Sequence, residues 1–290
     1  MGCFLGRPDF IAGNNRVRIL KGLAQGGFSE VLLAEDIDSG DKYAVKKIQV
    51  TDASDVAKVE WEISMHNLFI HPNVAPLVGS ASEPPIYYLV FPYYAKGSIH
   101  DDLCRRRIKR EYLPEVDVIR LFRGMCLAVE CVHMKSIAHR DLKPANFLYS
   151  DDRNPILIDF GSSCKMPMTI RTAKEMQKAL DDAAQNCSMA YRGPELFNCE
   201  IGTVFGTQVD IWSLGCCLYA LCYFVSPFDI AHEKGNSVAL AVQSPHTISY
   251  PGDAPYRPSL KTLIRKMLVV EPAERPAIKD IIFALDTLEI

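Results

Sequence analysis

Short β-branched segments, separated by glycine and aspartate, fill the first part of the chain after a short leader. Three of them are RVRIL (16–20), EVLLAED (30–36) and KYAVKKIQV (42–50), and together they predict three antiparallel strands. Apolar residues at positions 56, 59, 63 and 68 then recur with a helical period. This helix should end before Pro72, because a residue that precedes proline avoids helical backbone. The run IYYLVFPYY (86–94) predicts one further strand.

Longer helical patterns follow the turn AKGS (95–98), and the clearest are residues 116–134 and 209–225. We therefore expect an α+β, two-lobed fold, with a small β-rich N-lobe over 16–94 and a larger helical C-lobe over 95–290. Residues 1–15 are expected to form an N-terminal leader. A cleft between two lobes of this kind is a natural nucleotide site.

Composition indicates a soluble globular protein, with 48% hydrophobic and 23% charged residues. The net charge of -3 gives no general attraction to nucleic acid, so we expect no nucleic-acid partner. The most apolar run, 211–225, is too short to cross a bilayer and predicts a buried helix. The basic run RRRIKR (105–110) fits a nuclear address, a lipid-facing patch or a solvated helix face, and we favour the last.

The ten cysteines contain no C-x-x-C pair, which gives no support to a zinc ribbon or a thioredoxin-like site. The first residues also lack the basic and apolar segments of a secretory signal. We therefore expect a reducing compartment, in which the cysteines act as small core residues.

Two polar motifs point to a specific chemistry: HRDLKPAN (139–146) and DFG (159–161). Each motif alone could be a capped turn, but the pair in this order resembles the catalytic and metal-binding loops of eukaryotic protein kinases. The resemblance implies that Asp141 accepts the proton of the substrate hydroxyl, while Asn146 and Asp159 hold Mg²⁺. Lys143 resembles the lysine of serine/threonine kinases that reaches the γ-phosphate of ATP. The implied partners are ATP and a protein substrate with a Ser or Thr acceptor.

The segment YAVKK resembles the V-A-I-K strand of kinases and makes Lys46 the residue that pairs with the α- and β-phosphates. Lys47 should face the opposite side, because successive strand residues alternate. The partner of Lys46 should be a helical glutamate, either Glu60 or Glu62. Glu62 is favoured because, as in related kinases, it stands nine residues before His71.

The loop LAQGGFSEV lacks two glycines of a full G-x-G-x-x-G, since Ala24 and Ser29 replace the first and the third. Alone it could be a plain hairpin turn, but the kinase resemblance implies a variant lid over ATP. In the predicted hinge, Phe91 lies behind the adenine and Tyr94 supplies the N–H that Pro92 lacks. The resemblance assigns ATP binding to Leu23, Ala24, Gly26, Gly27, Phe28, Val31, Ala44, Lys46, Phe91, Pro92, Tyr94, Asn146 and Asp159.

Several further residues resemble structural positions of the kinase C-lobe. In YRGPELF, Gly193 replaces the alanine of A-P-E, and Glu195 should form a buried ion pair with Arg275. Asp210 and Trp212 resemble anchoring residues of the buried helix. Ser188 stands where a Ser or Thr steadies the catalytic Asp and Lys.

Within the kinases, GGFSEV, MHNLFIHPN, SVALAV and the prefix MGC resemble the Numb-associated kinase family, in particular its doubly acylated member. An apolar stripe at 173, 176, 180 and 183 predicts a helix inside the activation segment, where the alternative is a mobile loop. Such a helix would order the segment without phosphorylation, although Arg140 could still capture a phosphate on Thr169 or Thr172.

The resemblance also implies myristate on Gly2 and palmitate on Cys3, which would place a cytoplasmic protein on internal membranes such as the Golgi or perinuclear membranes. The motif prefers Ser or Thr at position 6, where this chain has Gly6, and a disordered leader is the alternative. The altered residues Ala24, Ser29 and Gly193 leave open a nucleotide-binding scaffold without turnover. A lipid or small-molecule kinase is disfavoured, because the stretch up to YRGPEL resembles a protein-substrate platform.

Overall fold

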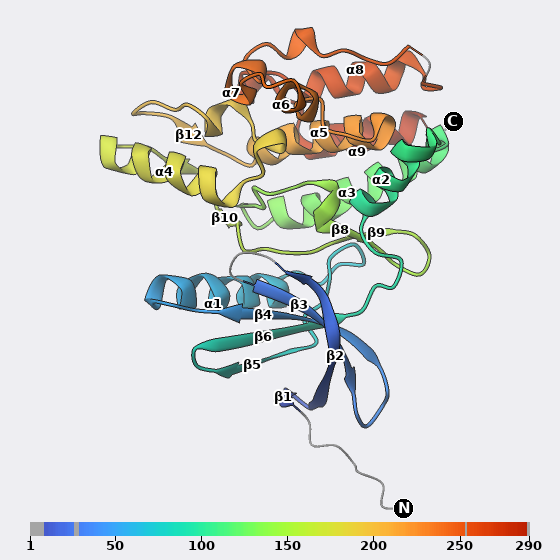
Figure 1. Ribbon diagram of the computed structural model, residues 1–290. Helices are drawn as coiled ribbons and strands as arrows, with labels where there is room; N and C mark the ends of the chain where they lie inside the picture. Colours follow the sequence, from blue (N-terminus) through green and yellow to red (C-terminus); the bar gives the residue numbers. More distant parts are fainter. Residues whose placement is uncertain (1–8, 26–28, 253, 289–290) are drawn as a thin grey trace, which may run out of the picture. The chain divides into compact units, whose positions relative to one another are not determined.

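The computed structural model describes residues 9–25, 29–252 and 254–288 of the chain, without the side chain of residue 232. The chain forms two compact units, which divide between Ala95 and Lys96 (Figure 1). The first unit contains a long antiparallel sheet and helix α1, and the second is mostly helical with short strands. The predicted α+β class is therefore confirmed.

Six strands build the sheet of the first unit within the described residues, in the order β1-β2-β3-β4-β6-β5 with every neighbouring pair antiparallel. Their bounds are β1 Phe10–Ala12, β2 Asn15–Gln25, β3 Ser29–Asp36, β4 Lys42–Gln49, β5 Gly79–Glu83 and β6 Ile86–Pro92. The hydrophobic pattern predicted β2, β3, β4 and β6. It missed β1 and β5, whose segments FIA and GSASE are too short or too polar to give a strand pattern.

The two outer strands of this sheet, β1 and β5, approach each other closely. A Cβ on Gly79 would lie 2.8 Å from the carbonyl oxygen of Ala12, so only glycine leaves room for this approach. Phe10 of β1 stacks on Tyr88 of β6 with ring centroids 4.3 Å apart. The segment 10–12, which the sequence analysis placed in the leader, therefore forms part of the folded unit.

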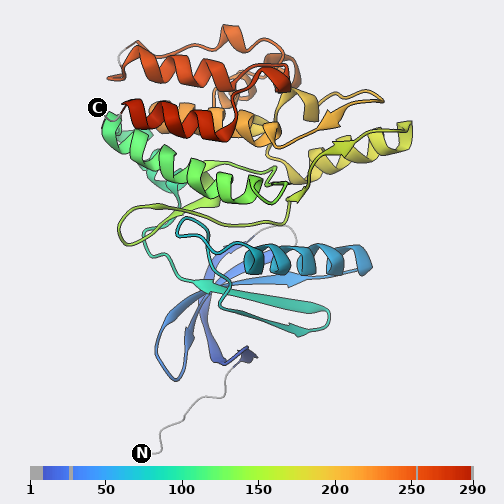
Figure 2. The same cartoon turned by 180° about the vertical axis from the view of Figure 1, so that it is seen from behind.

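Helix α1 (Ala53–Leu68) runs along the sheet (Figures 1 and 2). It begins at Asp52, whose side chain accepts the N–H groups of Ser54 and Asp55. Val59 packs with Leu89 of the sheet, whereas Leu68, at the end of the predicted stripe, is exposed. The helix ends where predicted, before His71 and Pro72.

In the second unit the helices are α2 Ile99–Lys109, α3 Glu115–His133, α4 Ala173–Asn186, α5 Gln208–Tyr223, α6 Asp229–Glu233, α7 Val238–Ala241, α8 Pro258–Met267 and α9 Ile278–Leu288. Short strands are β7 Ile137–Ala138, β8 Phe147–Tyr149, β9 Pro155–Leu157, β10 Cys164–Lys165, β11 Met168–Thr169 and β12 Val204–Phe205. The 3-10 turns are η1 Pro144–Asn146, η2 Met189–Tyr191, η3 Pro194–Leu196, η4 Pro245–Thr247 and η5 Pro272–Glu274.

Helix α5 is buried on every side, as its continuous apolar run predicts. Its three cysteines, Cys216, Cys217 and Cys222, are buried free thiols, and burial raises the pKa of each. They act as small core residues. Among the described residues, no helix is both long and apolar enough to span a membrane.

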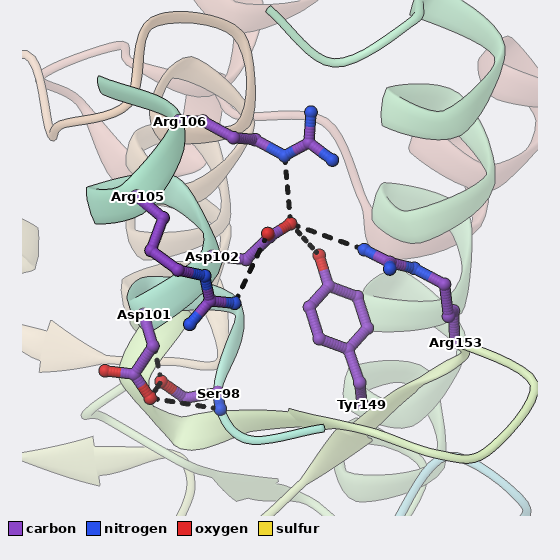
Figure 3. A network of polar contacts seen from close by, with 7 residues as sticks. All are labelled: Ser98, Asp101, Asp102, Arg105, Arg106, Tyr149 and Arg153. Carbon is purple, nitrogen blue, oxygen red and sulfur yellow. Dashed lines mark hydrogen bonds and ion pairs between the residues drawn. The ribbon is translucent and has the colours of Figure 1, made fainter. Parts of the chain in front are cut away.

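Helix α2 is tied to the rest of the second unit by a polar network around Asp102 (Figure 3). The helix begins with a capping box, in which Ser98 and Asp101 bond to each other's backbone N–H. The carboxylate of Asp102 accepts Tyr149 Oη at 3.2 Å and Arg106 Nε at 3.0 Å. It also accepts Arg105 and Arg153 at 3.4 Å. The basic run is therefore a solvated helix face only in part, since one of its arginines packs inward.

Candidate active site

Strand pairing in the first unit collects several predicted nucleotide-binding residues on one face of the sheet. Ala24 pairs with Val31, Val31 with Lys46, and Ala44 with Phe91. Directly paired residues share a face, as do residues two apart along one strand. Ala24, Val31, Ala44, Lys46 and Phe91 therefore lie on a common face. The opposite face packs Leu32, Ala34, Tyr43, Val45 and Val90 into the core.

Lys46 forms an ion pair with Glu62 of α1 on this face. Lys46 Nζ lies 2.7 Å from Oε1 and 2.9 Å from Oε2 of Glu62, and Glu62 is only 3% exposed. Glu60 is exposed, so burial distinguishes the two candidate glutamates. Lys47 has its amine 3.8 Å from Glu30. The pair with Glu62 fixes the ammonium group of Lys46 in one position.

Of the predicted hinge residues, Phe91 and Pro92 are the last two of β6, and Tyr94 follows it. The N–H of Tyr93 donates to the carbonyl of Lys42 at 3.2 Å. The N–H of Tyr94 has no acceptor within the described part of the chain, so it can serve an incoming ligand. Leu23 lies at an irregularity of β2 and is 40% exposed. Gly26, Gly27 and Phe28 lie outside the described residues.

In the second unit, buried Asp210 of α5 holds the loop that contains the HRD motif. Its carboxylate accepts the N–H groups of His139 and Arg140, each at 2.8 Å, and lies 2.9 Å from His133 Nε2. Burial alone would raise the pKa of Asp210, but the hydrogen bond and charge of His133 hold that pKa below its ordinary value. Asp210 anchors the HRD loop through these backbone hydrogen bonds, which agrees with the anchoring role expected from the sequence. The contact of His133 with the Asp210 carboxylate was not predicted.

Asp141 has its carboxylate fixed by three partners. Oδ1 accepts the N–H of Ser188 at 2.8 Å, and Oδ2 lies 3.0 Å from Asn146 Nδ2 and 2.9 Å from Lys143 Nζ. Lys143 also donates to Ser188 Oγ at 2.7 Å. Ser188 therefore contacts both Asp141 and Lys143, as the sequence analysis expected. The carboxylate is held in one orientation beside the ammonium group of Lys143, and a carboxylate fixed in this way is suited to accepting a proton from a bound hydroxyl.

The predicted metal ligands Asn146 and Asp159 stand at the same end of one hairpin. Asn146 directly precedes β8, Asp159 follows β9 by two residues, and these strands pair with Phe147 opposite Leu157. The N–H of Ile158 donates to the carbonyl of Asn146 at 3.0 Å. Asp159 has a positive φ of 65°, a rare conformation for a residue other than glycine that often marks functional sites.

These two oxygen donors fit Mg²⁺, which prefers hard oxygens and usually takes only one or two protein ligands beside phosphates and water. The described residues contain no group of three His, Cys, Asp or Glu side chains able to hold a metal by themselves.

The segment between the DFG motif and Pro194 is ordered by helix α4, as the apolar stripe predicted. Met176, Leu180 and Ala183 of this helix pack against a buried cluster that includes Ile170 and Phe205. Ala173, the first member of the stripe, is exposed.

Arg140 pairs with a carboxylate of α4 rather than standing open for a phosphate. Its Nη2 lies 2.6 Å from Asp182 Oδ2, and its side chain is only 6% exposed. Capture of a phosphate on Thr169 or Thr172 remains a prediction, and such a phosphate would compete with Asp182. Sequence reasoning missed Asp182, because nothing in the helical pattern identifies which polar residue meets an arginine 42 positions earlier.

The predicted pair between Glu195 and Arg275 is present and buried. It is bidentate, with N–O distances of 2.6 and 2.8 Å. A Cβ on Gly193 would lie 2.6 Å from Glu195 Oε2, so the glycine that replaces the usual alanine makes room for this carboxylate. The departure from A-P-E thus has a local packing reason. Trp212 lies under the guanidinium of Arg275 at 5.1 Å.

Comparison with known proteins agrees with this geometry. Residues 17–284 match the protein kinase domain family. The human Serine/threonine-protein kinase 16 is 35% identical over 294 residues, covering 99% of this chain and 95% of the human protein. Serine/threonine-protein kinase ppk13 of Schizosaccharomyces pombe is 30% identical over 312 residues, covering 94% of this chain and 90% of the yeast protein. Because the family model matches nearly the whole chain and both relatives are serine/threonine-protein kinases, the chain belongs to the protein kinase family and is a serine/threonine protein kinase.

Proposed function

We propose that this protein transfers the γ-phosphate of ATP to Ser or Thr hydroxyls of protein substrates, with Asp141 as the proton acceptor. In this proposal Lys46 holds the α- and β-phosphates, and Lys143 contacts the γ-phosphate. Asn146 and Asp159 hold Mg²⁺, which, when bound, neutralises charge on the phosphate oxygens. The face of Ala24, Val31, Ala44 and Phe91 holds the adenosine part.

One observation supports this function above the others: the fixed carboxylate of Asp141. Its Oδ2 lies 2.9 Å from the ammonium of Lys143, and Ser188 holds Oδ1 at 2.8 Å. Phosphoryl transfer depends mainly on positioning and charge neutralisation, so a pre-oriented base beside a fixed cation suits the reaction.

The test measures transfer of labelled phosphate from ATP, with Mg²⁺, to a generic protein substrate. Asp141→Asn keeps the shape of the side chain and removes the base, so transfer should fall by about 10²- to 10⁴-fold. Asp152→Asn, a change of one exposed carboxylate in the same unit, serves as the matched control. Equal transfer by wild type and Asp141→Asn would refute the proposal, and ATP binding without transfer by either would favour the nucleotide-binding scaffold.

We further propose that the protein is held on internal membranes by myristate on Gly2 and palmitate on Cys3, in the manner of the doubly acylated member of the Numb-associated kinase family. Both residues lie outside the described part of the chain, so the support is the sequence MGC alone. One myristoyl chain binds membranes only marginally, which is why stable attachment needs the second lipid. A peripheral position on the Golgi or a perinuclear membrane would suit substrates in membrane trafficking.

Fractionation of cells that express full-length variants tests this attachment. Cys3→Ser should weaken membrane association and Gly2→Ala should abolish it, because the first removes one lipid and the second removes the N-terminal acylation site. Membrane binding of Gly2→Ala at the level of wild type would contradict the proposal.

A further inference from the structure

A pocket of about 380 Å³ opens beside the proposed catalytic residues of the second unit. One wall is formed by residues 143–145 and 188–191, and the other includes His100 and Asp229. Lys143, which lines the pocket, has its amine 2.9 Å from Asp141 Oδ2. A substrate whose hydroxyl reaches Asp141 therefore passes this pocket with neighbouring residues.

The carboxylate of Asp229 has a fixed position in that wall. Its Oδ2 accepts the N–H of Ser226 at 2.9 Å, and Ser226 is fully buried. Ser226 Oγ in turn donates to the carbonyl of Ala190 at 2.5 Å, which joins the two walls of the pocket. Phe228, next to Asp229, stacks on buried Trp212 with ring centroids 5.5 Å apart. The acid is thus held by core packing instead of standing on a free loop.

The carboxylate of Asp229 forms no ion pair with the side chains that the structure describes, among which that of residue 232 is not included. Within the described part of the chain, no side-chain nitrogen of Lys, Arg or His lies within 4.0 Å of its carboxylate. Arg107, the arginine that lies nearby on α2, pairs with Glu233 instead, at 3.2 Å. Burial raises the pKa of Asp229, while the Ser226 hydrogen bond and the charges of His100 and Arg107 lower it in part, so the net pKa is raised and the ionised carboxylate is less well solvated than in water. A cation that enters the pocket would relieve this deficit, and the half-buried surroundings strengthen the attraction.

We propose that Asp229 binds a basic side chain of the protein substrate and so selects substrates with Arg or Lys close to the phosphorylated Ser or Thr. This inference rests on the proposed function, since it takes Asp141 as the point where the acceptor hydroxyl sits. A volume of 380 Å³ corresponds to a width of about 7 Å, or about two residues of extended chain. Because the pocket begins at Lys143, beside Asp141, we expect the basic residue within about two positions of the acceptor.

Two features of the pocket agree with a cationic ligand. Tyr191 also lines it, and aromatic rings attract ammonium and guanidinium groups. An acidic or phosphorylated side chain would instead meet the like charge of Asp229 and pay for its own desolvation.

The experiment uses full-length protein and a set of Ser peptides that carry Arg, Ala or Glu at each of the two positions on either side of the acceptor. Wild type should phosphorylate the best Arg peptide with a kcat/KM about tenfold or more above its Ala counterpart, mainly through KM. Asp229→Asn removes the charge but still accepts the Ser226 N–H, so the Arg-to-Ala ratio should fall to about one. Asp229→Lys should favour the Glu peptide over the Arg peptide. Asp152→Asn, the same charge change at an exposed position of the same unit outside the pocket, should keep the preference of wild type.

The possible failures separate the two proposals. A wild type that phosphorylates Arg, Ala and Glu peptides equally, or an Asp229→Asn variant that keeps the Arg preference, overturns the role of Asp229 while the kinase reaction stands. A wild type that phosphorylates none of the peptides or proteins offered refutes the proposed function, and the substrate preference with it.

Discussion

The ion pair between Glu195 and Arg275 gives a prediction whose size can be derived from the structure. The side chain of Arg275 is 0% exposed and that of Glu195 is 9% exposed. Glu195→Ala would leave the guanidinium buried without its counter-charge. Three backbone carbonyls, those of Gln208, Val269 and Val270, would remain as acceptors at 2.8 to 3.0 Å. They satisfy N–H groups, but they do not neutralise the charge.

Breaking a buried pair in this way costs about 3–5 kcal/mol of unfolding free energy. For a unit of this size, 1 kcal/mol shifts the midpoint of thermal unfolding by about 2–4 °C, so Glu195→Ala should lower it by about 6–20 °C. Glu195→Gln keeps an oxygen acceptor and should lie between wild type and Glu195→Ala.

The assay is thermal unfolding of full-length variants at one scan rate, because unfolding of proteins with more than one unit is commonly irreversible. The control is Asp117→Ala, which breaks an ion pair with Arg120 at 3.1 Å whose side chains are 38% and 46% exposed. That change should cost less than about 1 kcal/mol. High salt should weaken the exposed pair and leave the buried one unchanged. A midpoint for Glu195→Ala within about 2 °C of wild type would show that the guanidinium is solvated after the change, and the reasoning would be wrong.

Four further outcomes are expected. Asp159→Asn should lower phosphate transfer by orders of magnitude, and near-normal kcat would contradict the metal-ligand assignment. Its unfolding midpoint should change little, because asparagine tolerates the positive φ at this position. Ala24→Gly should change the KM for ATP more than kcat, and a large rise in kcat would show that the natural loop limits catalysis. Gly193→Ala should destabilise the protein by about 1–3 kcal/mol in urea unfolding, because the added Cβ meets the carboxylate of Glu195; a neutral effect would mean that this carboxylate moves freely. Burial raises the pKa of Asp102, but its arginine and tyrosine partners outweigh burial and hold that pKa below the ordinary value. The stability that the ionised Asp102 contributes is therefore present above about pH 4 and is lost as the pH falls further. In urea unfolding, the stability difference between wild type and Asp102→Asn should shrink below that pH.

Local pattern was sufficient for the class of fold and for much of the proposed chemistry. Short β-branched and aromatic segments predicted β2, β3, β4 and β6, and helical period predicted α1, α3, α4 and α5. The HRD and DFG motifs pointed to Asp141, Asn146 and Asp159 through their resemblance to the catalytic and metal-binding loops of protein kinases. The strands β1 and β5 escaped notice, since their three and five residues gain stability from neighbours on the sheet and not from their own pattern.

Contacts between distant parts of the chain were decided only by the tertiary structure. Helix geometry places Glu60 and Glu62 on different faces, but only packing against the sheet buries Glu62 beside Lys46 and leaves Glu60 in solvent. Asp182 meets Arg140, and Asp229 joins the wall beside Lys143, through chain folding that no periodicity encodes. The physical reason is that periodicity records which side of an element avoids water, whereas the partner of a buried charge is set by which elements pack together.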